Sequence, residues 1–177
     1  MLGAPVTVTP PAGELISAES AKSYLRVDGN ALNDEVDLLR AAAVTDVEQL
    51  TGLRLLNQTV EVTADCFDDL EQLRVGPVRT VTEIAYRDSA GDDQVVAAEN
   101  FELFGAPLEQ GIRLVGDASW PVAERGSIVL TLEVGYGLTA ADVPAPLRFA
   151  AYAALRGKFD DRDVDLACLV TNFRFWA

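Results

Sequence analysis

The sequence predicts a mixed α+β fold, in which helices near both ends of the chain form a framework around an inserted small antiparallel β-sheet or barrel. Three observations support this prediction: a long segment with hydrophobic residues at helical spacing, a middle section that alternates like strands, and a second helical segment that follows prolines. We expect one domain of 177 residues, large enough for a real core. Its expected parts are an extended arm (1–16), two helices (17–52), an inserted β region (57–135), a helix (142–163) and an apolar C-terminal tail (164–177).

The first segment predicts an arm and a short helix. Residues 1–16 contain three of the eight prolines and show no helical period, which favours an extended arm. Ser17 is expected to cap a helix that runs to about Val27, because its hydroxyl can accept a hydrogen bond from the first turn. The Asp-Gly-Asn sequence at residues 28–30 is a turn signal that ends this helix.

The second helix is the clearest element of the sequence. From about Ala31 to Thr51, hydrophobic residues recur at steps of three and four, and charged residues fill the other positions. Gly52 follows where a left-handed C-terminal cap belongs. Small side chains in the middle of the helix suit close packing against another helix, although an ordinary core helix is compatible with the same pattern.

The middle of the chain predicts six or seven short strands. Apolar and polar residues alternate within each segment, and clusters of glycine, proline and aspartate separate the segments. The five residues from Asp88 to Asp92 have the composition of a hairpin loop. The expected strands are Gln58–Phe67, Leu73–Val75, Thr80–Arg87, Gln94–Ala98, Phe101–Phe104, Ile112–Val115 and Ser127–Val134.

A further helix is predicted after the glycines at positions 135 and 137. Asp142 is expected to cap it, and either Pro144 or Pro146 suits its first turn, where a missing N–H leaves no hydrogen bond unmade. Hydrophobic residues from Leu147 to Phe159 then follow at helical spacing.

The C-terminal tail, residues 164–177, is unusually aromatic. It contains three aromatic residues and only two charged ones, Asp165 and Arg174. This composition is typical of an interface anchor, while a last helix or strand buried in the chain's own core explains it equally well.

The chain is strongly acidic, with 28 acidic and 14 basic side chains and a net charge of −14. Phosphate backbones repel such a chain, which disfavours binding in a nucleic-acid groove. The charge is uneven, because residues 145–177 hold five basic and four acidic side chains. That polarity could orient the closing segment towards a partner, and a merely soluble acidic surface is the simpler interpretation.

Several classes of site are disfavoured by the composition. Histidine is absent, which removes Ser-His-Asp and Cys-His nucleophile systems and every histidine-containing zinc site. Cys66 and Cys168 are expected to be buried free thiols. Gly135–Ala140 matches a relaxed dinucleotide fingerprint in the wrong context, and Asp160–Asp165 lacks the glycine and final glutamate of a calcium loop. We therefore expect no catalytic, metal-binding or cofactor-binding residue and no cofactor.

The sequence has no run of 18 apolar residues, so we expect no transmembrane helix. The first residues lack the basic and apolar regions of a signal peptide, which favours a cytoplasmic origin.

Several short motifs, taken in order, point to a known family. They are A-K-S-Y-L-R-V-D at 21–28, E-x-x-T-G at 48–52, P-V-x-x-V at 77–81, W-P at 120–121, V-G-Y-G at 134–137 and V-P-x-x-L-R at 143–148. Their order and spacing resemble the head–tail connector (adaptor) proteins of tailed bacteriophages, of the type found in phages HK97 and SPP1. The resemblance covers nearly the whole chain. One departure is F-D-D-R-D at 159–163, where the family usually carries an aromatic-x-x-Arg-Glu end.

The resemblance implies a structural virion protein and not an enzyme. Members of the family form a ring, typically dodecameric, below the portal protein of the capsid. The ring joins the portal to a stopper or tail-terminator protein and lines a channel through which DNA passes without specific binding. The resemblance thus implies a place in the neck of the virion, host cytoplasm before assembly, and no membrane partner.

The resemblance also suggests two candidate interaction surfaces. An inter-subunit helix face is expected at Ala41 and Ala42, beside Arg40. The candidate portal or neighbour interface lies in the tail and consists of Leu166, Leu169, Phe173, Arg174, Phe175 and Trp176.

Two alternatives stay open at this point. The chain could be another neck or tail-completion protein of the same kind of particle, or, in a different class, a carboxylate-based hydrolase or sugar-binding module built on the inserted sheet. A concave site with paired carboxylates of raised pKa would favour the second alternative. The sequence is compatible with a phage, a prophage or a gene transfer agent, with a free monomer or a ring, and with more than one channel-lining surface.

Overall fold

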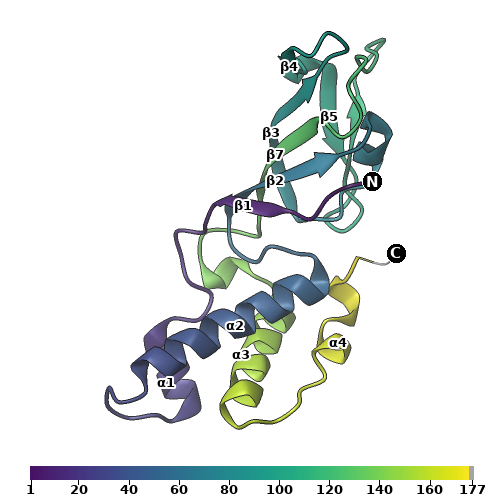
Figure 1. The fold of residues 1–177 in the computed structure, drawn as a ribbon. Coiled ribbons are helices and arrows are strands. Elements are labelled where there is room, and N and C mark those ends of the chain that lie inside the picture. The colour runs from purple at the N-terminus through teal and green to yellow at the C-terminus, as the bar shows by residue number, and fades with distance from the viewer. Residues whose placement is uncertain (176–177) are drawn as a thin grey trace. The chain divides into compact units, whose positions relative to one another are not determined.

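The computed structural model describes residues 1–175 and divides the chain into two compact units. The β unit consists of Met1–Pro11 and Asn57–Gly135, and the helical unit consists of Ala12–Leu56 together with the chain from Tyr136 onward. The helical unit is thus built from segments on both sides of the inserted β region. The predicted α+β fold is confirmed (Figure 1). The expectation that the whole chain acts as one connector domain stays a prediction.

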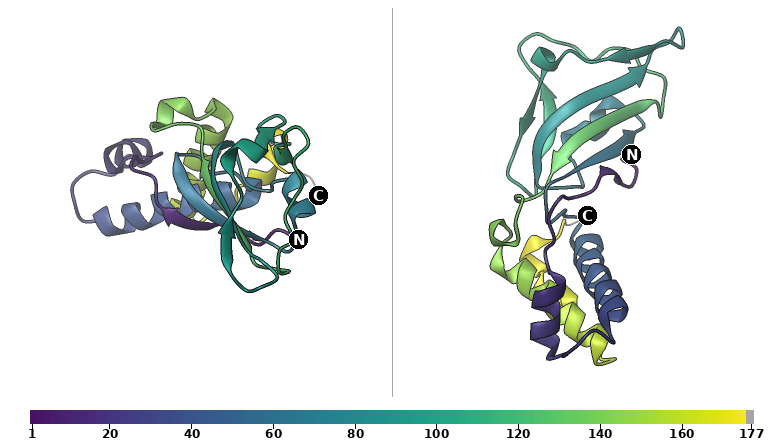
Figure 2. Two further views of the ribbon diagram at one scale, coloured as in Figure 1. Left: turned by 90° about the horizontal axis from the view of Figure 1, so that it is seen from above. Right: turned by 90° about the vertical axis from the view of Figure 1, so that its left-hand side faces the viewer.

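The β unit contains a five-stranded antiparallel sheet and a separate two-stranded hairpin. The strand order in the larger sheet is β1-β2-β7-β3-β4, so that β7, late in the sequence, lies between two early strands. Figure 2 shows the same strands from two further directions. The strands of the larger sheet are β1 (Val6–Thr9), β2 (Gln58–Ala64), β3 (Val78–Arg87), β4 (Asp93–Val95) and β7 (Ile128–Val134). The hairpin consists of β5 (Phe101–Phe104) and β6 (Gly111–Leu114).

The central strands form because their side chains alternate between core and solvent. In β2 and β7, alternate residues are buried, and the register places Val62 opposite Leu130. Both side chains are 2% exposed or less, and Ile84 of β3 adds a third fully buried side chain. The period-two pattern of the sequence therefore set both the position and the inward face of these strands.

Four predicted details of the β unit are wrong. The strand expected at Gln94–Ala98 is Asp93–Val95 in the structure, and Ala98 begins a 3₁₀ turn. Leu73–Val75 is not a strand. The side chains of Leu73 and Val75 are buried in the core, but the segment does not form a ladder of hydrogen bonds with a neighbouring strand. The strand that begins at Gln58 ends at Ala64, and the chain then enters the short 3₁₀ helix η1 (Phe67–Glu71). Cys66 therefore leaves the alternating pattern and is exposed, contrary to the expectation of a buried thiol.

The helical unit contains three helices of two or more turns and short helical turns. Ser17 caps the first helix as predicted, since its Oγ accepts a hydrogen bond from the Ser20 N–H at 3.1 Å. The second helix ends at a left-handed Gly52 with φ 75°, also as predicted. The helices are α1 (Ala18–Leu25), α2 (Asn33–Thr51), α3 (Ala145–Phe159) and α4 (Leu166–Leu169). The remaining 3₁₀ turns are η2 (Ala98–Asn100) in the β unit, and η3 (Ala140–Asp142) and η4 (Thr171–Phe173) in the helical unit.

The start of α3 differs from the expected cap. Asp142 does not cap α3, because its carboxylate accepts the Thr139 N–H at 2.9 Å and closes the preceding turn η3. Pro144 stands at the N-cap position of α3, and Pro146 lies in its first turn, where a missing N–H is tolerated. The helical core packs α2 against α3, with α1 against both. Among the described residues, no helix is both long and apolar enough to span a membrane.

Candidate functional site

The C-terminal tail folds onto the helical unit rather than extending from it. Asp165 caps α4 by accepting the Cys168 N–H at 3.1 Å, and Val170, directly after α4, is fully buried. The Phe175 N–H donates to the Thr51 carbonyl at the end of α2 at 3.4 Å. Cys168 is exposed, so the second expectation of a buried thiol is also wrong. Val170 therefore anchors the tail in the core, and the other described side chains of the tail are exposed or half-buried.

The predicted portal-interface residues lie along this anchored tail. Those within the described part of the chain are all half-buried, so each covers some of the chain's own surface and presents the rest to solvent. Trp176, predicted as part of the same interface, lies outside the described residues. The half-buried residues are Leu166, Leu169, Phe173, Arg174 and Phe175.

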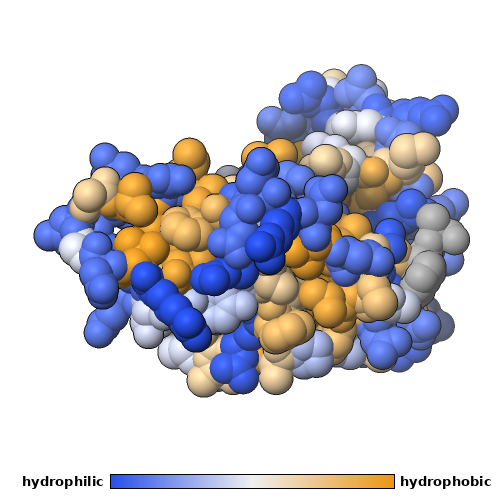
Figure 3. Space-filling view, turned by 90° about the horizontal axis from the view of Figure 1, so that it is seen from below, coloured by the Kyte–Doolittle hydropathy of each residue, from blue (hydrophilic) through white to orange (hydrophobic). Residues whose placement is uncertain are grey.

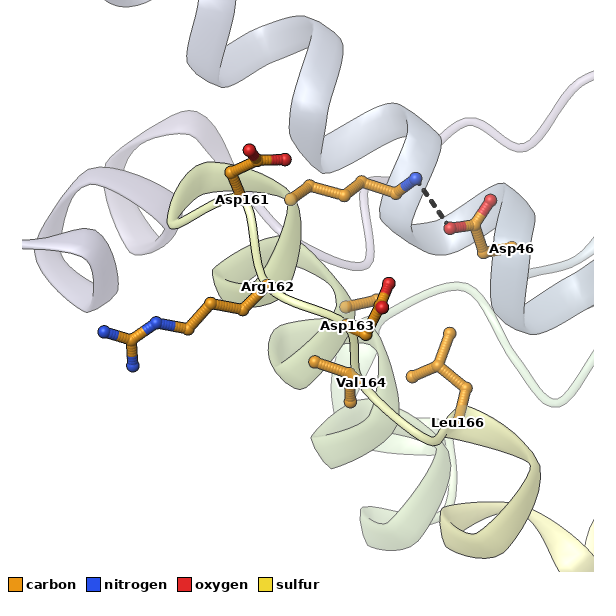
Figure 4. A pocket seen from close by; sticks show the side chains of 9 residues that line it. Asp46, Asp161, Arg162, Asp163, Val164 and Leu166 are labelled. Carbon is orange, nitrogen blue, oxygen red and sulfur yellow. Dashed lines mark ion pairs between the residues drawn. The ribbon is translucent and has the colours of Figure 1, made fainter.

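A hollow of about 440 Å³ is lined by residues of α2, the end of α3 and the start of the tail (Figure 4). On its wall, Lys158 of α3 pairs with Asp46 of α2 at 2.7 Å. Gly157 permits the tail to pass close by, because a Cβ at this position would lie 2.6 Å from Cγ2 of Val164. Figure 4 shows the Arg162 side chain directed away from the Lys158–Asp46 pair. The hollow is open and lined by mixed charges, which suits a contact surface better than a small-molecule site.

The residues of the predicted inter-subunit helix face do not all lie on the same side of α2. Val36, Ala43 and Val47 are buried, and the opposite side of the helix is exposed. Ala41 lies on the exposed side, and Ala42 is half-buried at its margin. We call the exposed side the α2 stripe; it consists of Asp34, Leu38, Ala41, Thr45 and Gln49.

Arg40, the third predicted residue of that face, is turned towards its own chain. Its guanidinium pairs with Asp37 at 2.7 Å and with Glu14 at 3.0 Å, and it donates to the Ile16 carbonyl at 3.0 Å. Arg40 therefore tethers the segment that precedes α1 to α2. The most exposed large hydrophobic side chain on α2 is instead Leu38, at 70% exposure, which the sequence reasoning passed over.

A second exposed surface, on α3 and α1, was missed by the sequence reasoning. Phe149 of α3 is 59% exposed, and one helical turn further on Tyr152 makes an edge-to-face contact with Tyr24 of α1, at 5.0 Å between ring centroids. We call Tyr24, Phe149 and Tyr152 the aromatic patch. The sequence could have indicated this exposed side chain. Leu147 and Ala151 lie on the buried face of α3 at helical spacing, and Phe149 does not fit that spacing.

Charge is distributed unequally between the units and within the helical unit. The β unit carries fifteen acidic and five basic side chains, and the helical unit carries thirteen acidic and nine basic ones. Within the helical unit, the sequence of α2 contains five acidic residues and one basic residue, whereas that of α3 contains three basic residues and no acidic one. Figure 3 shows hydrophobic residues, in orange, interrupting the polar surface on the face of the molecule seen from below.

Burial and hydrogen bonding shift the pKa values of several carboxyl groups. Burial raises the pKa of the Glu48 carboxyl group in α2, because it disfavours the charged form, although the N–H of Leu55 donates to it at 2.8 Å. The carboxyl groups of Asp69 and Asp88 in the β unit have lowered pKa values, each held mainly by hydrogen bonds to the charged form. Residues 1–175 contain no cluster of three or more potential metal ligands.

Among the comparisons with known proteins, the comparison with solved structures finds similar chains. No model of a protein family matches the sequence, and no curated protein matches it. The fold is similar to that of a chain from the neck of an empty gene transfer agent particle computed with C6 symmetry, with a TM-score of 0.81 and 20% identity over 100% of this chain and 96% of that one. A chain from the virion of a native gene transfer agent particle matches with a TM-score of 0.81 and 20% identity over 98% of this chain and 96% of that one.

A third structure, the neck of a native gene transfer agent particle computed with C12 symmetry, contains a chain that matches with a TM-score of 0.73 and 19% identity, over 100% of this chain and 96% of that one. At these levels of identity the likeness establishes a shared fold. The shared fold extends over essentially the full length of both chains, so it includes the helices as well as the inserted strands.

Proposed function

We propose that this protein is a structural component of the neck of a tailed, phage-like particle. The observation that supports this most strongly is the full-length fold similarity, at a TM-score of 0.81, to a chain from the neck of a gene transfer agent particle. The order of short motifs along the sequence supports the same class independently. The C6 and C12 symmetry of the neck structures favours a ring of copies, and we propose such a ring for this chain.

Within that class we propose the connector (adaptor) role suggested by the sequence resemblance, of the type in phages HK97 and SPP1. The ring would contain about twelve copies, join the portal to the stopper or tail-terminator protein, and perform no catalysis. Before assembly, the copies of the chain would be in the host cytoplasm. The net charge of −14 supports a channel that DNA passes without being gripped, because acidic side chains repel phosphate.

For the portal contact we propose the tail from Leu166 onward. Its mixed exposure supports this, since the half-buried Phe173 and Phe175 present aromatic surface beside Arg174, a composition enriched at binding hot spots. Truncation at Asp165 would remove the buried Val170 and disturb the helical unit. A sharper variant keeps Val170 and replaces Phe173 and Phe175 by alanine.

We expect the Phe173→Ala/Phe175→Ala variant to bind the portal protein at least about tenfold more weakly, because losing two aromatic anchors removes 1.4 kcal/mol or more of binding free energy. Leu138→Ala is the matched control, since Leu138 is a 67% exposed hydrophobic residue of the same unit, outside the tail. Equal portal affinity for the tail variant and the control would refute the tail as the portal contact.

The proposed function is tested by deleting the gene for this chain from the genome that encodes it. We expect DNA-filled heads without attached tails, and restoration of tailed particles when the gene is supplied in trans. Purified particles should contain the chain in ring stoichiometry, which also separates a connector from a single-copy completion protein. Intact tailed particles made without the chain would refute the proposal.

A further inference from the structure

We propose that the α2 stripe of one copy docks against the aromatic patch of the next copy, head to tail, and that this contact closes the ring. The inference rests on the proposed function, because it names the surfaces that would build the proposed ring. It differs from the sequence expectation, which named only one helix face and included Arg40 in it. The structure assigns Arg40 to an internal role and supplies a second, different face as the partner.

The α2 stripe has the form of a protein contact surface. It runs along one side of a helix, with the large hydrophobic Leu38 at 70% exposure followed by the small residues Ala41 and Thr45. The Thr45 hydroxyl donates to the Ala41 carbonyl at 3.0 Å, so it is satisfied within the helix and needs no water. Small side chains beside one exposed leucine allow another helix to approach closely.

The aromatic patch has the complementary form. Phe149 is 59% exposed and Tyr24 is 42% exposed, and Tyr152 joins them through its ring contact with Tyr24. Aromatic residues and arginine are enriched at the centres of protein interfaces, and Arg148 lies beside Phe149 in the sequence. The Arg148 side chain is half-buried, so part of it is accessible beside the exposed Phe149.

Charge complementarity selects a second copy as the occupant. The helix that bears the stripe holds five acidic residues, three of them (Asp34, Glu35 and Asp37) in its first turns, against one basic residue. The helix that bears Phe149 holds three basic residues and no acidic one. Two of these basic residues, Arg156 and Lys158, pair within the chain with Asp160 and Asp46, which leaves Arg148 beside Phe149 as the basic residue of the patch. The helix that bears the stripe begins with exposed acidic residues, so two stripes would bring like charges together, whereas the stripe of one copy and Arg148 of another carry opposite charges.

The arrangement of the two helices also favours a ring over a closed dimer. Within one chain, α2 and α3 already pack against each other through their buried faces, so the stripe and the aromatic patch remain exposed on different helices. A contact between two different surfaces is heterologous, and it repeats until the rotation closes. This is the kind of contact a C6 or C12 ring requires.

The test is site-specific cross-linking of the full chain, in a background where the exposed Cys66 and Cys168 are replaced by serine. Leu38→Cys is made in one preparation and Phe149→Cys in another, and the two are mixed with a short bis-maleimide, both alone and with the portal protein of the same particle. We expect the mixture to give cross-linked heterodimers several-fold faster than either preparation alone. A chain carrying both substitutions should give a ladder of oligomers.

Leu138→Cys in place of Phe149→Cys is the matched control, because Leu138 is 67% exposed in the same unit and belongs to neither surface. Cross-linking of Leu38→Cys to Leu138→Cys as fast as to Phe149→Cys would overturn the inference. Preferential homodimers of Leu38→Cys alone would do the same, since they would indicate a two-fold contact. If the wild-type chain forms rings while the cross-linking shows no preference, the proposed function stands, but the stripe and the aromatic patch are not the ring contact. Absence of the chain from particle necks refutes the proposed function itself.

Discussion

The side-chain amide of Gln110 takes the place of a strand partner for Val78. Oε1 of Gln110 accepts the Val78 N–H at 2.7 Å, and Nε2 donates to the Val78 carbonyl at 2.8 Å. Gln110 is only 8% exposed, and its own carbonyl accepts the Leu73 N–H at 2.8 Å. One buried glutamine therefore provides hydrogen-bond partners for the backbone N–H and carbonyl of Val78 at the start of β3, and for the backbone N–H of Leu73 before it.

Gln110→Leu should destabilise the β unit by about 2 to 5 kcal/mol, because it leaves both the N–H and the carbonyl of Val78 buried without a partner. Urea denaturation followed by circular dichroism measures the change. Gln72→Leu is the matched control, since Gln72 is exposed in the same unit and its replacement should change the free energy of unfolding by about 0.5 kcal/mol or less. Equal effects of the two substitutions would contradict the role assigned to Gln110.

Ser17→Ala should lower the stability of the helical unit by about 1 kcal/mol, because α1 loses the hydroxyl that accepts the Ser20 N–H. Thermal unfolding followed by the helical circular dichroism signal measures the loss. Ser23→Ala, at an exposed position within the same helix, should be neutral or slightly stabilising, since alanine has the higher helix propensity. A destabilisation of the same size at both serines would indicate that capping is not the cause.

Glu48 should make the helical unit less stable as the pH rises through its raised pKa. Burial raises this pKa, so the folded chain holds the proton more tightly than the unfolded chain. The corresponding stability is fully present below the ordinary pKa of a glutamate and is lost across the window between that ordinary pKa and the raised pKa of Glu48. The measurement is urea unfolding of wild type and Glu48→Gln at several pH values.

The free energy of unfolding of wild type should fall relative to that of Glu48→Gln as the pH rises through this window. Glutamine keeps an oxygen for the Leu55 N–H, so the hydrogen bond is retained in the variant. Glu35→Gln, an exposed carboxyl in the same helix, controls for the loss of one charge from α2. A constant difference between wild type and Glu48→Gln at every pH would contradict the raised pKa.

Gly157→Ala should destabilise the helical unit by about 1 to 3 kcal/mol, although alanine is the better helix former. The new Cβ would lie 2.6 Å from Cγ2 of Val164 and 2.8 Å from the Arg162 carbonyl oxygen. Adding Val164→Ala should recover part of the loss, because it removes one of these two clashes. Thermal unfolding of the single and double variants measures both effects, and a stabilised Gly157→Ala would show that the tail does not approach α3 this closely.

The elements predicted correctly are those whose side-chain period is long and uninterrupted. The strand from Gln58 and the helix ending at Thr51 lie within a few residues of their predicted bounds, because many hydrophobic residues repeat in them. The prediction of a strand at Leu73–Val75 was wrong because a short apolar run can be buried equally well in an irregular segment. The role of Gln110 could not be read from the sequence, since its partner Val78 lies 32 residues away.

The candidate surfaces were predictable only in part, for a similar reason. Small residues at 41 and 42 indicated a helix contact, and the structure does expose Ala41. The orientation of Arg40 depends on Glu14 and Ile16, which the fold brings to it from before α1. The aromatic patch combines α1 with α3, so the contact between Tyr24 and Tyr152 required the packing of segments more than a hundred residues apart.

The central claim, that this chain is the ring-forming connector of a particle neck, is tested most directly by native mass spectrometry. The protein is measured alone and after mixing with the portal protein of its own particle. We predict either a free ring or a monomer that assembles on the portal in ring stoichiometry, with twelve copies the expected number. A chain that stays monomeric and does not respond to the portal would contradict the account.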